Sequence, residues 1–200
     1  DNGKKLLCTS SYNWCVLLDI ATKEVLFHTT ATPNAHSAEL LPGNRIVVAC
    51  SEGSGAGNNS VQLYDISQPN RILYQSALGS APGVVWNETT QRLYAIGGQS
   101  LQIYKLKDWE TAAPSLELEK TVQTPQGGLH DMSYVNSNTL CIGGRRAYLY
   151  DIGANRFTEM MLFSASTAIK SINYNDETGE LWYTDSTNPE GSQSWSQQTI

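Results

Sequence analysis

The fold is decided by two stretches, YAIGGQSLQIYKL (Tyr94–Leu106) and LCIGGRRAYLYDI (Leu140–Ile152), which share an Ile-Gly-Gly step and an alternating tyrosine-containing segment 46 residues apart. Two further segments, VLLDI from Val16 and QLYDI from Gln62, repeat the end of this pattern at the same spacing of 46 residues. Each pair of strands is preceded by one extended segment and followed by another, with Gly, Asn, Ser and Pro turns between them. The repeating unit is therefore four short strands in about 40 to 48 residues.

A unit of this length and strand count is typical of a β-propeller blade, which buries its two faces only by packing against neighbouring blades. An antiparallel sandwich would contain similar strands without a fixed spacing. We therefore predict an all-β propeller with four-stranded antiparallel blades. The first strands are expected to start near His36, Pro82, His130 and Ile169. Residues 1–200 are predicted to form one propeller domain, with blade units at about 5–30, 36–77, 82–124, 130–163 and 169–200.

The first and last repeat units each contain fewer than four strands. The first unit begins at its second strand, KLLCTS, and the last ends in SWSQQTI after two strands. Because a ring needs a whole number of blades, typically about four to eight, we expect a piece of a larger ring of about six or seven blades. The polypeptide would then continue beyond Ile200 and before Asp1. A closed five-bladed ring is the alternative.

Composition limits the classes of partner. Acidic residues outnumber basic ones by 19 to 13, and this net charge of −6, without a basic run, argues against a general nucleic-acid surface. The longest apolar stretches, such as RIVVAC and WCVLLDI, have the length of strands and are too short to span a membrane. We expect a soluble, monomeric protein. The start DNGKK lacks the apolar region of a secretory signal, so such a signal is either removed or was never present.

The four cysteines, Cys8, Cys15, Cys50 and Cys141, lie in apolar runs without a metal-type spacing, which favours buried thiols. A two-residue hairpin loop at Ser11 and Tyr12 would place Cys8 opposite Cys15 and permit a disulfide without requiring one.

The glycine pairs Gly97–Gly98 and Gly143–Gly144 are predicted to form hairpin turns, since glycine readily adopts the positive φ that such turns need. They are not phosphate loops, because no G-x-G-x-x-G spacing precedes a helix.

Two of the three histidines open first strands, and each has a carboxylate close behind it. In a propeller the first strands surround the central channel, and we expect ligands to bind where these strands start. In the aligned repeats, the first position of the first strand is occupied by His36, Pro82, His130 and Ile169. The next position is occupied by Ser37, Gly83, Asp131 and Lys170. The predicted ligand-binding residues of this funnel are His36, Glu39, His130, Asp131 and Lys170, with Arg145 and Arg146 from the loop after a second strand.

Three interpretations of these residues remain open at this stage. They can bind a small polar ligand, such as a carbohydrate or an organic acid attracted by Lys170, Arg145 and Arg146. Alternatively, His36, His130 and Asp131 can hold a divalent metal in a lactonase-like lyase or hydrolase acting on a sugar-derived substrate. The third interpretation is structural, with these side chains bonded to the backbone of a neighbouring blade. No H-E-x-x-H or G-x-S-x-G motif is present, so we favour a non-catalytic binding module.

Three segments resemble an uncharacterised family of bacterial propellers that is known only as a domain of unknown function: HSAELLPGNRIVVACS from His36, GVVWNETTQRLYAIG from Gly83, and GLHDMSYV from Gly128, followed by YLYDI. The resemblance spans nearly the whole chain. It implies a propeller fold, a longer full-length protein and export to the periplasm or cell surface. At Pro82 the chain departs from the family, whose members often carry a histidine there.

Overall fold

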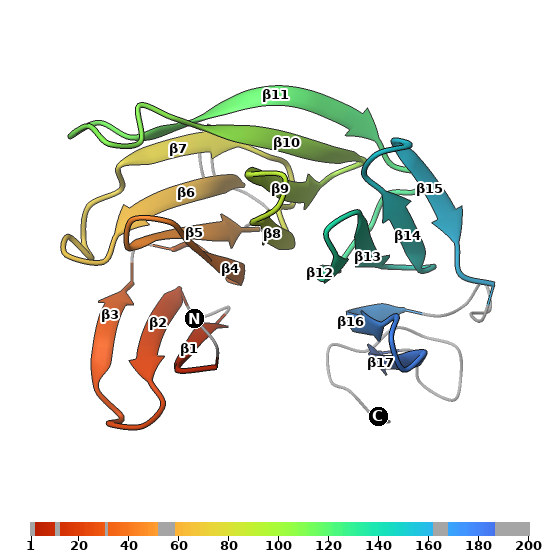
Figure 1. Ribbon diagram of the computed structural model, residues 1–200, viewed down its shortest axis with the longest axis horizontal. Coiled ribbons are helices and arrows are strands. Elements are labelled where there is room, and N and C mark those ends of the chain that lie inside the picture. The colour runs from red at the N-terminus through yellow and green to blue at the C-terminus, as the bar shows by residue number, and fades with distance from the viewer. Residues whose placement is uncertain (1–2, 11–12, 31, 52–58, 162–167, 187–200) are drawn as a thin grey trace.

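The computed structural model describes residues 3–10, 13–30, 32–51, 59–161 and 168–186, and the regular elements in these ranges are 17 strands in five antiparallel sheets (Figure 1). Short runs rich in Val, Ile, Leu and Tyr form the strands, and turn residues separate them. The all-β propeller predicted from the repeat is therefore confirmed at the level of the fold.

Each sheet is built from strands that are consecutive in the chain. The first sheet contains β1 (Lys5–Ser10), β2 (Trp14–Asp19) and β3 (Val25–Thr29). The second contains β4 (Ala35–Leu41), β5 (Arg45–Cys50), β6 (Ser60–Asp65) and β7 (Tyr74–Ala77). The third contains β8 (Gly83–Asn87), β9 (Arg92–Gly97), β10 (Ser100–Lys107) and β11 (Ser115–Gln123). The fourth contains β12 (Asp131–Asn136), β13 (Thr139–Gly143), β14 (Tyr148–Asp151) and β15 (Arg156–Glu159), and the fifth contains β16 (Ile169–Asn175) and β17 (Glu180–Asp185).

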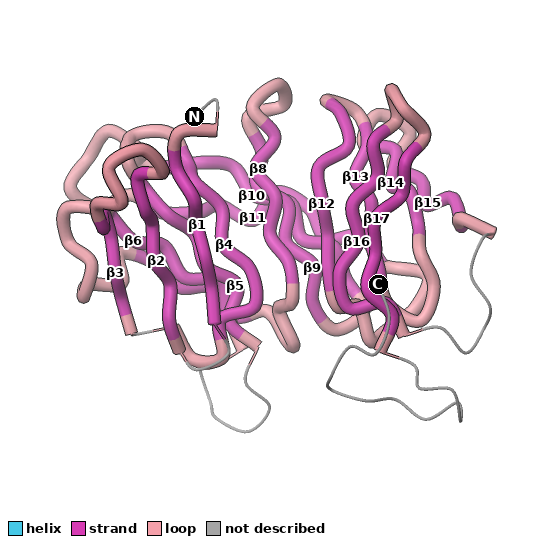
Figure 2. The backbone as a smooth tube through the Cα atoms, turned by 90° about the horizontal axis from the view of Figure 1, so that it is seen from below, coloured by secondary structure: helices cyan, strands magenta, loops and turns pink. Residues whose placement is uncertain are grey.

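The five sheets stand around an arc, each with its first described strand toward the centre and its last toward the outside (Figure 1). The inner strands β1, β4, β8, β12 and β16 follow one another around this arc, and each contacts the next (Figures 1 and 2). By the repeat, β1 corresponds to the second strand of a blade, as the sequence predicts. The first strands β4, β8, β12 and β16 therefore line the centre and position the candidate site.

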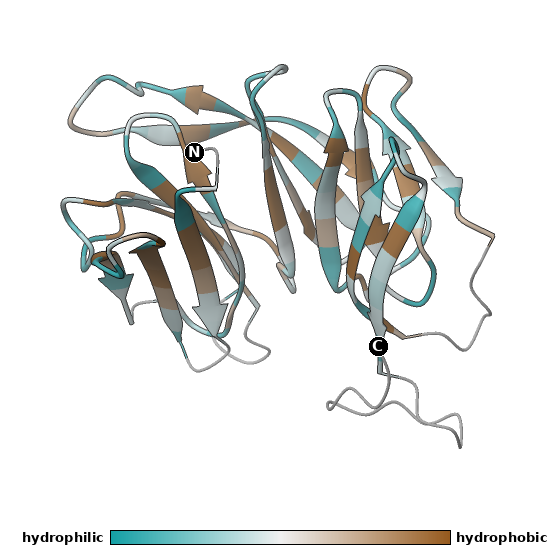
Figure 3. Cartoon of the chain, turned by 60° about the horizontal axis from the view of Figure 1, so that its bottom comes forward, coloured by the Kyte–Doolittle hydropathy of each residue, from teal (hydrophilic) through white to brown (hydrophobic). Residues whose placement is uncertain are grey.

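The hydrophobic core lies between the sheets. In β5, Val47 and Ala49 pack with residues of the third sheet, whereas the alternating residues Ile46 and Val48 pack with residues of the first. Because both faces of β5 are covered, its sequence RIVVAC is a nearly continuous run of apolar residues. Figure 3 shows hydrophobic bands along the strands, which are the segments that form this core. Each blade is thus held by its neighbours, as a propeller requires.

The predicted register of the first hairpin is wrong by one residue. Thr9, not Cys8, faces Cys15, so the connection is longer than the two-residue loop on which the cysteine pairing depended. Cys8 is exposed and Cys15 is buried, and both are free thiols. Residues 11 and 12 themselves lie outside the described part of the chain.

The prediction that both glycine pairs form hairpin turns is only partly correct, because some of these glycines belong to strands. Gly98 has a φ of +59°, but Gly97 pairs with Ser100 as the last residue of β9. A Cβ on Gly97 would lie 2.6 Å from the carbonyl oxygen of Gly79, so this glycine is required by close packing and not by its φ. Gly143 ends β13 and precedes a loop to β14 that is longer than a two-residue turn.

Candidate functional site

A funnel of about 640 Å³ opens where the first strands begin. Residues at or next to the starts of β4, β8, β12 and β16 line it: His36, Pro82, His130 and Lys170. Loop residues complete the wall, among them Asn34, Ser51, Ser80, Gly98 and Gly128. The prediction named none of these loop residues. Ser51 and Gly98 both directly follow a second strand, so the repeat itself contained the signal that could have found them.

The fifth sheet contributes the predicted residue Lys170 to the funnel, and not Ile169, which the repeat aligned with His36. Ile169 is fully buried in the core, and the β16–β17 pairing is irregular between Ile169 and Ser171. The β4–β5 pairing has the same irregularity between Ala35 and Ser37, beside His36. A bulge adds one residue to a strand and turns its side chain away from the regular alternation. The two bulges thus place His36 and Lys170 in equivalent positions at the mouth of the channel.

His130 and Lys170 form the central contact of the funnel. The Nζ of Lys170 lies 2.9 Å from the Nε2 of His130. An ammonium group can only donate, so Nε2 accepts and the imidazole carries its proton on Nδ1. Burial, the nearby Lys170 ammonium and His36 together lower the pKa of His130 from 6.5 to about 4. Burial also lowers the pKa of Lys170. His130 is therefore neutral at pH 7 and orients the lysine.

His36 also lines the funnel, but its two ring nitrogens have the reverse hydrogen-bonding roles from those of His130. Its Nδ1 lies 2.8 Å from the carbonyl oxygen of Asn34, and a carbonyl only accepts, so Nδ1 donates. In a neutral imidazole this leaves Nε2 as an acceptor. Conversely, His130 retains Nδ1–H as a donor, and neither of these two ring nitrogens has a hydrogen-bond partner among the described residues. The funnel thus offers an ammonium group, one ring donor and one ring acceptor.

The two predicted arginines separate in the structure. Arg145 lines a small crevice of about 100 Å³ that shares Gly128 and His130 with the funnel. Arg146 forms an ion pair with Glu159 on the outer strand β15 and does not line the funnel. The loop after β13 therefore supplies Arg145 to the site, whereas Arg146 stabilises the blade through its ion pair. Arg146 was predicted at the funnel, and the structure instead places its side chain against Glu159.

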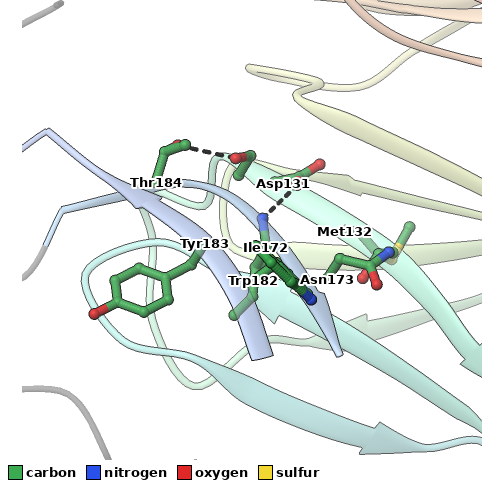
Figure 4. Close-up of a pocket in the computed structure, with 9 residues that line it drawn as sticks. Asp131, Met132, Ile172, Asn173, Trp182, Tyr183 and Thr184 are labelled. Carbon is green, nitrogen blue, oxygen red and sulfur yellow. Dashed lines mark hydrogen bonds between the residues drawn. The ribbon is translucent and has the colours of Figure 1, made fainter. Parts of the chain in front are cut away.

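Asp131 is also absent from the lining of the funnel. Its Oδ2 accepts a hydrogen bond of 2.7 Å from the backbone N–H of Ile172, across the junction of β12 and β16 (Figure 4). It lines a different pocket, together with Trp182, Tyr183 and Thr184 of β17. Burial raises the pKa of Asp131. The structural interpretation applies to this carboxylate, because its hydrogen bond to Ile172 joins two neighbouring blades.

Replacing Asp131 by alanine is expected to lower the free energy of unfolding by about 1 to 3 kcal/mol, because a buried backbone donor loses its acceptor. Asp131→Asn keeps an oxygen for Ile172 and removes the cost of burying a charge, so its stability should equal or exceed that of the wild type at pH 7. Urea denaturation of both variants measures the difference. Equal destabilisation by alanine and asparagine would contradict the assigned bond.

Glu39 lies in a third pocket, of about 480 Å³, with Trp86, Lys5 and Glu88. Its carboxylate accepts hydrogen bonds from the backbone N–H groups of Trp86 in the neighbouring blade and of Leu40. Burial outweighs these bonds and raises the pKa of Glu39 to about 7. Glu39 was predicted among the funnel residues, but it does not line the funnel and instead bonds an adjacent strand.

The residues present do not fit the metal-dependent alternative. Of its three candidate ligands, only His36 and His130 line one pocket, because Asp131 is turned toward Ile172. The Nε2 of His130 is already occupied by the ammonium of Lys170. Across the described ranges, no group of three or more His, Cys, Asp or Glu side chains could hold a metal ion.

Five antiparallel sheets stacked around a central channel, with a polar funnel at the starts of the inner strands, define the class of β-propellers. Within that class, the chain belongs to the family of unknown function DUF6528, whose model matches residues 2–185. This agrees with the uncharacterised propeller family that the sequence resembles. No curated protein matches the chain.

A solved structure supports the same fold. The chain is similar to the C-terminal WD40 domain of Sif2, with a TM-score of 0.63 and 11% sequence identity. The match covers 94% of this chain and 51% of that one, so the chain spans about half the length of the WD40 structure. At this identity the likeness shows the fold alone. The total number of blades stays a prediction. Among the described residues, no helix has the length and apolar character needed to cross a membrane.

Proposed function

We propose that the funnel binds a small hydroxylated carboxylic acid, such as a uronate or another sugar acid, without catalysing a reaction. The observation that carries this proposal is the contact between Lys170 and the neutral His130, at 2.9 Å, in a pocket shared with His36. A positioned ammonium group is a partner for a carboxylate. None of the described residues that line the funnel is acidic, although the chain carries 19 acidic residues.

The two imidazoles support the hydroxylated part of this ligand. His130 offers Nδ1–H as a donor, and the neutral form of His36 offers Nε2 as an acceptor, because its Nδ1 donates to Asn34. A hydroxyl group both donates and accepts, so it can satisfy either ring. Pro82, Leu129 and the glycine backbones supply the less polar wall. This combination of a few polar groups on a shaped apolar wall is typical of binding sites for small molecules.

The lyase or hydrolase alternative has less support. Its metal would need a third ligand beside the two histidines, and Asp131 serves the neighbouring blade instead. The binding interpretation uses Lys170, His36 and His130 in the positions in which they lie. We therefore favour a binding module over an enzyme.

Pairs of ligands that differ only in the carboxylate test this proposal. Isothermal titration at pH 7 with glucuronate against glucose, and galacturonate against galactose, should give affinities at least about 10-fold higher for the acids. The reason is the charge-assisted bond that only the acid can form with Lys170. Higher salt should reduce this advantage. Equal binding of an acid and its neutral sugar, or no binding of any acid, would refute the proposal.

A further inference from the structure

The Arg145 crevice continues the funnel on the side of the fourth blade. It is lined by Gly128, His130, Gly144, Arg145 and Ala168, and it shares the first two of these with the funnel. A Cβ on Gly144 would lie 2.8 Å from the carbonyl oxygen of Gly128, so the backbones approach closely here. A Cβ on Gly128 would meet nothing within 4 Å. The imidazole of His130 thus contacts Lys170 in the funnel and lines the same crevice as Arg145.

The guanidinium of Arg145 has no hydrogen-bond or ion-pair partner among the described residues, as is also true of Arg156, but only Arg145 lies beside the funnel. Arg92 and Arg146 are each paired with a glutamate, and Arg45 stacks on the ring of Trp109. The described residues that line the crevice include no acidic side chain. An unneutralised guanidinium beside a pocket is suited to a carboxylate, which it can bind through two parallel bonds.

The backbone on both sides of Arg145 is fixed. The carbonyl of Gly144 accepts a bond of 2.9 Å from the N–H of Ile169, and the carbonyl of Arg146 accepts one of 3.1 Å from the Nε2 of Gln126. The Arg146 side chain is held by Glu159. Arg145 is therefore presented at the crevice by an anchored loop, which reduces the entropy lost when it binds a ligand.

We propose that Arg145 binds a second carboxylate, so that the preferred ligand is a hydroxylated chain with two acidic groups. One carboxylate would lie at Lys170 in the funnel and the other at Arg145 in the crevice, and His130 lines both pockets. This inference rests on the proposed function and makes it more specific. Two sources share this chemistry: a free dicarboxylic sugar acid, and a short oligomer of uronates.

Glucarate and gluconate provide the matched test, because they differ only in the carboxylate at one end of a six-carbon chain. Titration of the full chain should show glucarate binding about 10-fold more tightly than gluconate. Arg145→Gln should reduce this ratio to about one. Arg156→Gln removes the same charge from exposed β15, away from both pockets, and should leave the ratio unchanged. Digalacturonate against galacturonate, in the same three proteins, identifies an oligomeric source.

The outcomes separate this inference from the proposed function. Equal affinities for glucarate and gluconate, or an Arg145→Gln ratio that stays at the wild-type value, overturn the second carboxylate but leave the monoacid site intact. Failure of every acid, including gluconate and glucuronate, overturns both proposals. A higher affinity for digalacturonate than for galacturonate that is lost in Arg145→Gln supports the inference and assigns the oligomer. If the advantage of glucarate over gluconate is lost in Arg145→Gln but digalacturonate shows no advantage over galacturonate, the ligand is a free dicarboxylic acid.

Discussion

Replacing Lys170 by methionine is expected to weaken the binding of glucuronate by about 30- to 100-fold, the largest effect on affinity that the site predicts. The methionine retains much of the aliphatic length of lysine but removes the ammonium that bonds His130 at 2.9 Å. The carboxylate would then lose its charged partner, whereas the neutral sugar would lose little. Titration calorimetry with glucuronate and glucose in both proteins measures this difference.

A second measurement tests the same contact without a ligand. Burial, Lys170 and His36 lower the pKa of His130 to about 4, and Lys170→Met removes the second of these causes. The pKa of His130 should therefore rise toward 6.5, as followed by the imidazole proton resonances in NMR. Lys120→Met, on the exposed face of β11, is the matched control and should change neither the affinity nor this pKa. An unaltered pKa of His130 in the Lys170 variant would contradict the contact itself.

The repeat was a good guide to the strands because propeller blades place equivalent residues at equivalent depths. First strands expected near His36, Pro82, His130 and Ile169 begin at Ala35, Gly83, Asp131 and Ile169. The shared pocket of His36 and His130 followed from the same alignment. Spacing alone could thus bring together two residues that are 94 positions apart in the chain.

The direction of individual side chains could not be predicted in the same way. An alignment assigns residues to equivalent positions but does not give the direction of each side chain. His36 and Lys170, each beside a bulge, line the funnel as predicted, whereas Glu39, Asp131 and Arg146 do not. Asp131 follows His130 directly, and alternation along a strand sends adjacent side chains to opposite faces. Its carboxylate therefore reaches Ile172 instead of the pocket. The hairpin before Cys15 shows the same sensitivity, because one additional loop residue changed the cysteine register.

Replacing Glu39 by glutamine is expected to stabilise the protein above pH 7 by up to about 3 kcal/mol, from a pKa that burial raises from 4.5 to about 7. The folded state holds this proton more tightly than the unfolded state does. The stability that protonated Glu39 provides is therefore complete below pH 4.5 and is lost as the pH rises through 7. Glutamine stays neutral throughout and keeps an oxygen that can accept the bonds from Trp86 and Leu40.

The difference between Glu39→Gln and the wild type, measured by urea denaturation at several pH values, isolates this carboxylate from the other groups that titrate. It should be near zero at pH 4 and should grow to a plateau above pH 7. Glu119→Gln provides a control of opposite sign, because Arg92 and Lys105 lower the pKa of Glu119 to about 2, and this substitution should destabilise the protein at neutral pH. A difference for Glu39→Gln that does not vary with pH would mean that Glu39 is solvated in the folded protein. Its bond to the neighbouring strand would then not be part of how the second and third blades are joined.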